Sequence, residues 1–361
     1  MCSPLAERVP VWGERPFRQS PDRAEKVQPD ERKPMKGLVK SWLRSVKLEK
    51  PQMFKAVAIV PIRSPGDGTY RYRCLGEALK SSDIAITEVS AAGSVPELLV
   101  TNRGKSSVLL IDGEELSGAF QNRVLNTSIL LKEASETRIP VSCTEQGRWS
   151  PISKLFSESG NVMAYKTRSR KTRSVHSSLE ANGTHRSDQS EVWHGISELQ
   201  AKTGTHSPTS AMNDVFKAHE PELRKCDEIF TPVPNQIGLI AFIGGAPVGL
   251  DIVSLSGVYA RLHPKLVRSY ILEALAATDQ SFDPGSVTLR AEKFLDEITL
   301  SDEREFASTG HGIDHRFKGK GLAGSALVHE NEVIHAAFFR LEGPDSQEGS
   351  SSHRQRRLFR M

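Results

Sequence analysis

The sequence predicts an α+β protein. Its β-rich first half, an antiparallel sheet or a barrel-like arrangement, packs against a second half of mixed helices and hairpins. Two observations support this. Short apolar or alternating segments follow one another closely between residues 54 and 144 with one short helix among them, and the longer helical patterns begin only at Asp188. Because a regular alternation of strands and helices is missing, an antiparallel sheet is favoured over a parallel one.

The first half gives most of the expected strands. They are apolar or alternating runs rich in β-branched residues, bounded by turn sequences such as the one at residues 102–105. We expect strands at residues 54–62, 84–89, 98–101, 108–111, 127–131 and 138–144, and a short helix at residues 75–79. In the last strand, Ile139, Val141 and Cys143 share one face.

The second half mixes helices with hairpins. Asp188 and Glu191 have the spacing of a helix-capping box, and further helices are expected at residues 210–219 and 221–229. The glycines at residues 244–245 lie between two apolar runs and predict a hairpin of residues 237–243 and 248–253. The strongest helical pattern follows Pro264, and strands are expected at residues 313–317, 322–328 and 333–339.

Charge and composition divide the chain into three parts. Of its 361 residues, 48 are Lys or Arg and 44 are Asp or Glu. Residues 1–50 hold twelve of the basic and seven of the acidic side chains, and residues 342–361 hold four and three. We therefore expect a largely disordered basic N-terminal extension (1–50), a single α+β domain of near-neutral charge (51–341) and a disordered C-terminal tail (342–361). A short amphipathic piece that includes Trp42 could form a helix that docks on the domain.

Several classes of protein are disfavoured. No apolar stretch approaches the ~20 residues that span a bilayer, and the charged N-terminus lacks the apolar core of a secretory signal, so a cytoplasmic location without membrane association is expected. A nucleic-acid partner is disfavoured because the basic excess lies in the tails. The four cysteines form no CxxC pair, which argues against a disulfide framework and a structural zinc site.

The segment from residue 109 to residue 126 could carry chemistry. An apolar strand runs into acids and is followed by amides and an arginine, which together could form a polar pocket above a core. These residues are Asp112, Glu114, Glu115, Gln121, Asn122 and Arg123. Carboxylates can act as general acids or bases, and arginine offers a planar fork to phosphate. The other interpretation is a charged hairpin turn whose acids face water.

A second segment, residues 139–149, has a similar composition. Its strand ends in Glu145, Gln146, Gly147, Arg148 and Trp149. Trp149 and Arg148 could stack on a nucleotide ring, or Trp149 could close the edge of the core. Cys143 could be a nucleophile, but its apolar neighbours favour a buried, inert thiol.

The remaining candidates give weaker signals. His311 and His315 lack an obvious third metal ligand, so no metal site is assigned, and His335 fits a partly buried strand position with a hydrogen-bond partner. The glycines at residues 244–245 are not followed by the helix that a phosphate loop needs. The basic run at residues 166–174 could touch phosphates, although a solvated loop is the favoured interpretation.

Together, these segments resemble the ARG and Rhodanese-Phosphatase-superfamily-associated protein domain family. The strings DGEEL, QNR and VSCTEQGRW carry the resemblance, and later blocks beginning at Asp188, Leu266 and Gly321 extend it over roughly residues 52–341. The family name implies an association with ADP-ribosylglycohydrolases and with rhodanese- or phosphatase-type proteins, and so with ADP-ribose or NAD metabolism. The basic N-terminal extension is not a feature of that family.

Two functions follow as hypotheses. In the first, the domain binds or processes a phosphate-bearing nucleotide metabolite such as ADP-ribose or an NAD derivative. Glu114 or Glu115 would be the acid or base, Arg123 and Arg148 would hold phosphate, and Trp149 would stack. In the second, the same polar residues form an internal network in a non-catalytic module. The sequence does not identify a cofactor or a protein partner.

Overall fold

The computed structural model describes residues 37–90, 93–275 and 283–341. Among these residues it has eight helices and eighteen strands, so the predicted β-rich α+β class is confirmed. The described helices include none with the length and apolarity that a bilayer crossing requires.

The largest sheet has nine antiparallel strands in the order β1-β3-β13-β14-β18-β17-β16-β15, with β2 paired to β3. Its members are β1 (Lys47–Leu48), β2 (Gln52–Phe54), β3 (Val57–Arg63), β13 (Gln236–Ile243), β14 (Ala246–Val253), β15 (Asp302–Ala307), β16 (Ile313–Gly319), β17 (Leu322–His329) and β18 (Glu332–Arg340). The hairpin expected around the glycines at 244–245 is confirmed as β13 and β14.

Two smaller sheets come from the first half of the chain. One has the order β10-β7-β4 and the other β12-β8-β9-β11-β6-β5. Their strands are β4 (Tyr72–Cys74), β5 (Ile84–Glu88), β6 (Glu97–Asn102), β7 (Ser107–Leu110), β8 (Glu114–Gly118), β9 (Arg123–Leu125), β10 (Ile129–Leu131), β11 (Ser135–Cys143) and β12 (Phe156–Val162). Among the described strands, β4 and β7 form the one parallel pair.

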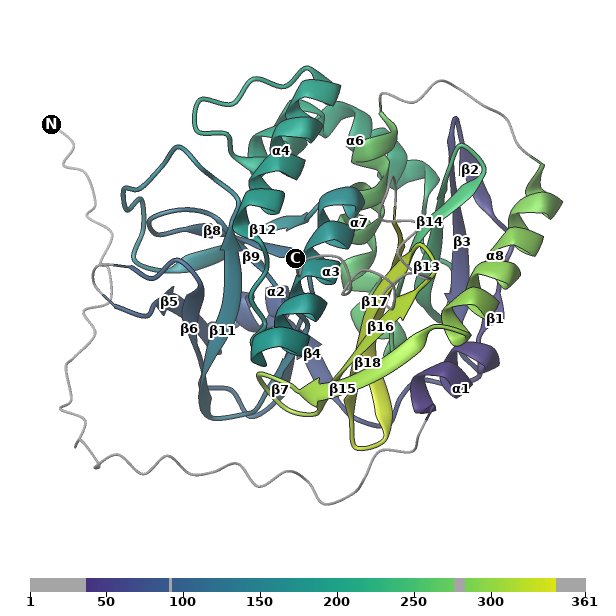
Figure 1. Ribbon diagram of the computed structural model, residues 1–361, viewed down its shortest axis with the longest axis horizontal. Helices are drawn as coiled ribbons and strands as arrows, with labels where there is room; N and C mark the ends of the chain where they lie inside the picture. The colour runs from purple at the N-terminus through teal and green to yellow at the C-terminus, as the bar shows by residue number, and fades with distance from the viewer. Residues whose placement is uncertain (1–36, 91–92, 276–282, 342–361) are drawn as a thin grey trace, which may run out of the picture. The chain divides into compact units, whose positions relative to one another are not determined.

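Helices cover both faces of the nine-stranded sheet (Figure 1). Helices α1 (Leu38–Ser45) and α8 (Pro284–Thr299) pack on one face, where Val39 and Phe294 join the same apolar core. On the other face α7 (Ser256–Ala274) contacts β13 and β14 and also reaches β4 and β12 of the smaller sheets. The remaining helices are α2 (Leu75–Lys80), α3 (Tyr165–Asn182), α4 (Gln189–Thr203), α5 (Met212–Ala218) and α6 (Glu220–Ile229).

Several elements agree with the sequence analysis. The amphipathic piece near Trp42 is α1, which lies on the nine-stranded sheet. Asp188 caps α4, because its carboxylate accepts hydrogen bonds from the backbone N–H groups of Ser190 and Glu191. Disorder was expected over residues 1–50 and 342–361. Of these, residues 1–36 and 342–361 lie outside the described residues, and residues 46–50 contain the short strand β1.

The sequence pattern predicted a helix that begins at Pro264. In the structure Pro264 lies inside α7, which starts at Ser256. A proline in a helix removes one backbone N–H bond to the carbonyl four residues earlier. Both Pro264 and that residue, Ala260, are exposed, so water can satisfy the carbonyl. The sequence analysis also missed α8 and the strands β1, β4, β8, β9, β12 and β15.

The expectation of a solvated basic loop at residues 166–174 is wrong, because these residues belong to helix α3. Arg168 and Lys171 are completely buried rather than exposed. They lie at helical spacing with Thr172, Val175 and Leu179, so the buried face of α3 is largely polar, and hydrophobic periodicity did not reveal it.

Candidate functional site

The two polar segments singled out from the sequence lie together in the six-stranded sheet. Residues 114–125 form the β8–β9 hairpin, and Cys143 at the end of β11 pairs with Arg123 of β9. Beyond this pair, the backbone N–H of Thr144 donates to the carbonyl of Asn122 (3.0 Å), and that of Asn122 donates to the Glu145 carboxylate (3.3 Å). Because both segments follow strand ends, the sequence predicts that they lie side by side, and the structure confirms this proximity.

Asp112 lies at the centre of a buried group that we call the Asp112 cluster, made of Asp112, Arg168, Lys171 and Asp251. The Nε of Arg168 donates to Asp112 (3.0 Å), and its two terminal nitrogens donate to both oxygens of Asp251 (3.0 and 2.7 Å). Lys171 pairs with the other oxygen of Asp112 and donates to the backbone carbonyl of Leu125 (2.9 Å). All four side chains are at most 1% exposed, so α3 is joined to β14 and to the segment after β7 by a neutral set of charges.

Neighbouring groups add hydrogen bonds around this cluster. The hydroxyl of Tyr270 donates to Asp251 (2.7 Å), and the Nδ1 of His335 lies 2.8 Å from the hydroxyl of Ser128. Burial alone would raise the pKa of the Asp251 carboxyl, but the adjacent Arg168 guanidinium lowers it. Gly113 has a left-handed backbone (φ 82°), and a Cβ there would lie 2.8 Å from Arg168, so no larger residue fits without moving the guanidinium chain.

Glu114 is also buried and paired. One of its oxygens pairs with Lys265 of α7, which also reaches Glu158 of β12 (2.6 Å). The other oxygen accepts from the backbone N–H of Ile111 (3.2 Å). Burial raises the pKa of Glu114, and the nearby Lys265 opposes this rise.

Glu115 differs from Glu114 because it has no cationic partner among the described residues. It accepts a hydrogen bond from the hydroxyl of Thr144 (2.8 Å), and burial raises its pKa to about 7. In the β8–β9 ladder Leu116, not Glu115, is opposite Arg123. Because successive side chains point to opposite faces of a sheet, Glu115 and Arg123 lie on different faces.

Arg123 is the least satisfied of the buried charges. It is 0% exposed, yet one terminal nitrogen alone forms a hydrogen bond, to the side-chain oxygen of Gln121 (3.0 Å). Its Nε and Nη2 have no hydrogen-bond partner among the described residues, and Nη2 lies 3.9 Å from Glu88, whose Oε1 is also without a hydrogen bond. Trp149 covers this guanidinium at 5.7 Å from its ring centre and is 49% exposed. We call Gln121, Arg123 and Trp149, with Glu88, the Arg123 site.

The loop after β11 is held by Arg148. Its guanidinium donates to Glu145 (2.6 Å), to the carbonyl of Ala119 (2.7 Å) and to the side chain of Asn122 (3.3 Å). Trp149, the next residue, stacks on Phe120 with ring centres 5.4 Å apart. Gln146 is exposed.

Cys143 is buried as predicted, with 1% of its surface exposed, and burial raises the pKa of its thiol. The side-chain amide of Gln189 holds the backbone of Cys143 on both sides: its oxygen accepts from the Cys143 N–H (2.8 Å) and its nitrogen donates to the Cys143 carbonyl (2.9 Å). A protonated, enclosed thiol is a poor nucleophile.

Sequence reasoning missed the cations that pair with Asp112 and Glu114, namely Arg168, Lys171 and Lys265. For α3 a signal was present: no acid occurs between Glu158 and Glu180, so the cations of α3 needed partners elsewhere in the chain. Lys265 was hidden within an apolar helix pattern. In the part of the chain that the structure describes, no group of three or more His, Cys, Asp or Glu side chains could hold a metal ion.

Searches of curated proteins and of solved structures find no match. A family model, the ARG and Rhodanese-Phosphatase-superfamily-associated Protein domain, matches residues 45–339 and so contains every residue of the Asp112 cluster and the Arg123 site. The chain belongs to this family.

Proposed function

We propose that the domain binds a phosphate-bearing nucleotide metabolite, such as ADP-ribose or an NAD derivative, at the Arg123 site. The observation that carries this proposal is the buried Arg123 guanidinium with two nitrogens that lack hydrogen bonds among the described residues. Buried polar groups in folded proteins nearly always have partners, and an exception calls for an ion, a water or a ligand. A phosphate oxygen is a strong acceptor for such a donor.

The surroundings favour a ligand with an aromatic ring. Trp149 covers Arg123 and has about half of its surface exposed, so a ring next to the phosphate would meet an aromatic side chain. Arg148 donates to protein groups on both sides of its loop. In this proposal Arg148 and Glu145 therefore position Trp149, and Arg123 alone contacts the phosphate.

For Asp112 and Glu114 we favour the second hypothesis, an internal network that fixes the fold. All four carboxylate oxygens of Asp112 and Glu114 have protein partners. A fully satisfied buried network needs no ligand. Glu115, with its raised pKa, is the acid that could exchange a proton near neutral pH, but it lies on the sheet face away from Arg123.

Calorimetric titration of ADP-ribose into the full chain tests the proposal. We expect saturable binding to the unsubstituted protein and at least about tenfold weaker binding to Arg123→Met, because one charge-assisted interaction is lost. Arg138→Met is the matched control: it removes the same charge from neighbouring β11, where Arg138 is 66% exposed and 3.8 Å from Glu97. Equal affinity of the Arg123 and Arg138 variants, or no binding of ADP-ribose, ADP or NAD to any form, would overturn the proposal.

A further inference from the structure

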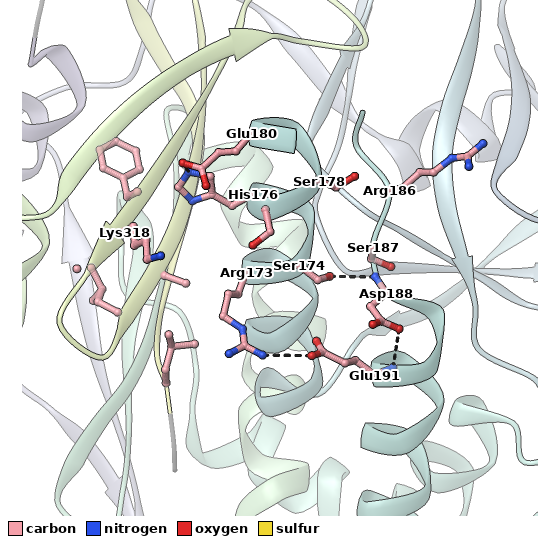
Figure 2. A pocket seen from close by; sticks show the side chains of 16 residues that line it. Arg173, Ser174, His176, Ser178, Glu180, Arg186, Ser187, Asp188, Glu191 and Lys318 are labelled. Carbon is pink, nitrogen blue, oxygen red and sulfur yellow. Dashed lines mark hydrogen bonds and ion pairs between the residues drawn. The ribbon is translucent and has the colours of Figure 1, made fainter. Parts of the chain in front are cut away.

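A separate pocket lies beside α3, between this helix, the start of α4 and the β16–β17 hairpin (Figure 2). Its volume is about 450 Å³, within the range of small-molecule sites. The apolar side chains of Phe317, Leu322 and Ala323 form part of its wall. No residue of the Arg123 site lines it.

Each acid of this pocket has a protein partner, although Oε2 of Glu191 forms no hydrogen bond with the described residues. Glu191 accepts from Arg173 (3.2 Å), Glu180 from Arg304 (2.8 Å), and Asp188 caps the N-terminus of α4. Lys318, by contrast, has no hydrogen bond or ion pair with any residue that the structure describes. Figure 2 shows its side chain extending from the hairpin toward α3, on the same side of the helix as Arg173 and His176. The lining holds three cations (Arg173, Arg186 and Lys318) and three acids (Glu180, Asp188 and Glu191). Because Arg304 from outside the pocket pairs with Glu180, Lys318 is left without an acidic partner among the described residues.

His176 gives a second and independent indication of a ligand. It is 7% exposed and lines the pocket, but its Nε2 forms no hydrogen bond with the described residues. A carboxylate oxygen of Glu180 lies 3.5 Å from this nitrogen. Burial lowers the pKa of His176, so at neutral pH it is an uncharged imidazole that can hydrogen-bond a hydroxyl group.

From these contacts we infer that the pocket binds a small phosphomonoester with hydroxyl groups, such as a phosphorylated sugar. Lys318 and Arg173 would face the phosphate, His176 would bond a hydroxyl, and the carbon skeleton would lie on the apolar wall formed by Phe317 and Leu322. A phosphate suits the two cations Lys318 and Arg173 better than a carboxylate does, because a phosphate carries nearly two negative charges at neutral pH. The inference is independent of the function proposed for the Arg123 site.

Titration of ribose 5-phosphate into the full chain, followed by calorimetry, tests this inference. We expect saturable binding that Lys318→Met weakens about tenfold, the loss of one charge-assisted contact. Lys320→Met is the matched control, since Lys320 is exposed in the same hairpin turn but does not line the pocket. The His176 imidazole signals in an NMR spectrum should shift on addition of ribose 5-phosphate, and Arg123→Met should leave this binding unchanged.

Three results would overturn the inference. One is the absence of saturable ribose 5-phosphate binding. Another is an equal loss of affinity in the Lys318 and Lys320 variants, which would show that only the net charge of the protein matters. The third is that ribose alone or inorganic phosphate alone binds as tightly as ribose 5-phosphate, because the pocket would then not recognise the combination of groups. Besides these three, loss of binding in Arg123→Met would also overturn the inference, because the ligand would then lie at the Arg123 site.

Discussion

Asp112 and Arg123 belong to the same short polar segment and are both buried, yet their surroundings differ. Asp112 is paired with Arg168 and Lys171, and both of its oxygens are used. Arg123 has one hydrogen bond and two nitrogens without one among the described residues. The difference shows that burial of a charged residue does not by itself mark a ligand site, and that the completeness of its hydrogen bonding separates the two halves of this segment.

The largest expected effect on the free energy of unfolding concerns Arg168 of the Asp112 cluster. Arg168→Met should lower the free energy of unfolding by about 3–5 kcal/mol, because Asp112 and Asp251 would lose a shared buried partner. Arg170→Met, on the exposed side of the same helix, should change it by no more than about 0.5 kcal/mol, since its ion pair with Glu198 is at the surface. Urea unfolding of both variants measures this, and similar losses in the two would contradict the structural role of the cluster.

The next largest effect is the pH dependence of stability that Glu115 causes. The pKa of Glu115 is raised to about 7 in the folded protein from an ordinary value of 4.5, so the folded state binds more protons between these pH values. The contribution of Glu115 to stability is therefore full below pH 4.5 and is lost as the pH rises through 7. Relative to the unsubstituted protein, Glu115→Gln should gain up to about 3 kcal/mol between pH 4.5 and pH 8.

Unfolding of the Glu115→Gln variant at several pH values measures this difference. Glu136→Gln is its control, because Glu136 is an exposed acid of strand β11 in the same sheet. A stability difference that stays constant from pH 4.5 to pH 8 would mean that Glu115 is ionised at little cost in the folded protein.

The smallest expected effect on stability concerns Arg123, whose hydrogen bonding is incomplete. Arg123→Met should change the free energy of unfolding by no more than about 1 kcal/mol, since Arg123 has one neutral hydrogen-bond partner and a distant acid. Thermal and urea unfolding measure this. A loss as large as that of Arg168→Met would show that Arg123 is part of the scaffold.

The sequence could predict the fold class and most strands, because their apolar and alternating patterns are local. It could also place residues 112–123 beside residues 145–149, because both follow strand ends. It could not predict the Asp112 cluster: Asp112, Arg168 and Asp251 come from distant parts of the chain, and only the packing of α3 on the nine-stranded sheet brings them together. The assignment of Glu115 and Arg123 to opposite sheet faces depended on the β8–β9 register, which the sequence analysis did not include.

The most direct test of this contrast is urea unfolding of Arg168→Met and Arg123→Met with and without saturating ADP-ribose. A ligand that binds only the folded state stabilises it by an amount that grows with its concentration. We expect Arg168→Met to be strongly destabilised in the free protein, and Arg123→Met to be nearly as stable as the unsubstituted protein but no longer stabilised by ADP-ribose. If ADP-ribose stabilises Arg123→Met as much as the unsubstituted protein, or if both variants unfold with the same large loss, the distinction between scaffold and site is wrong.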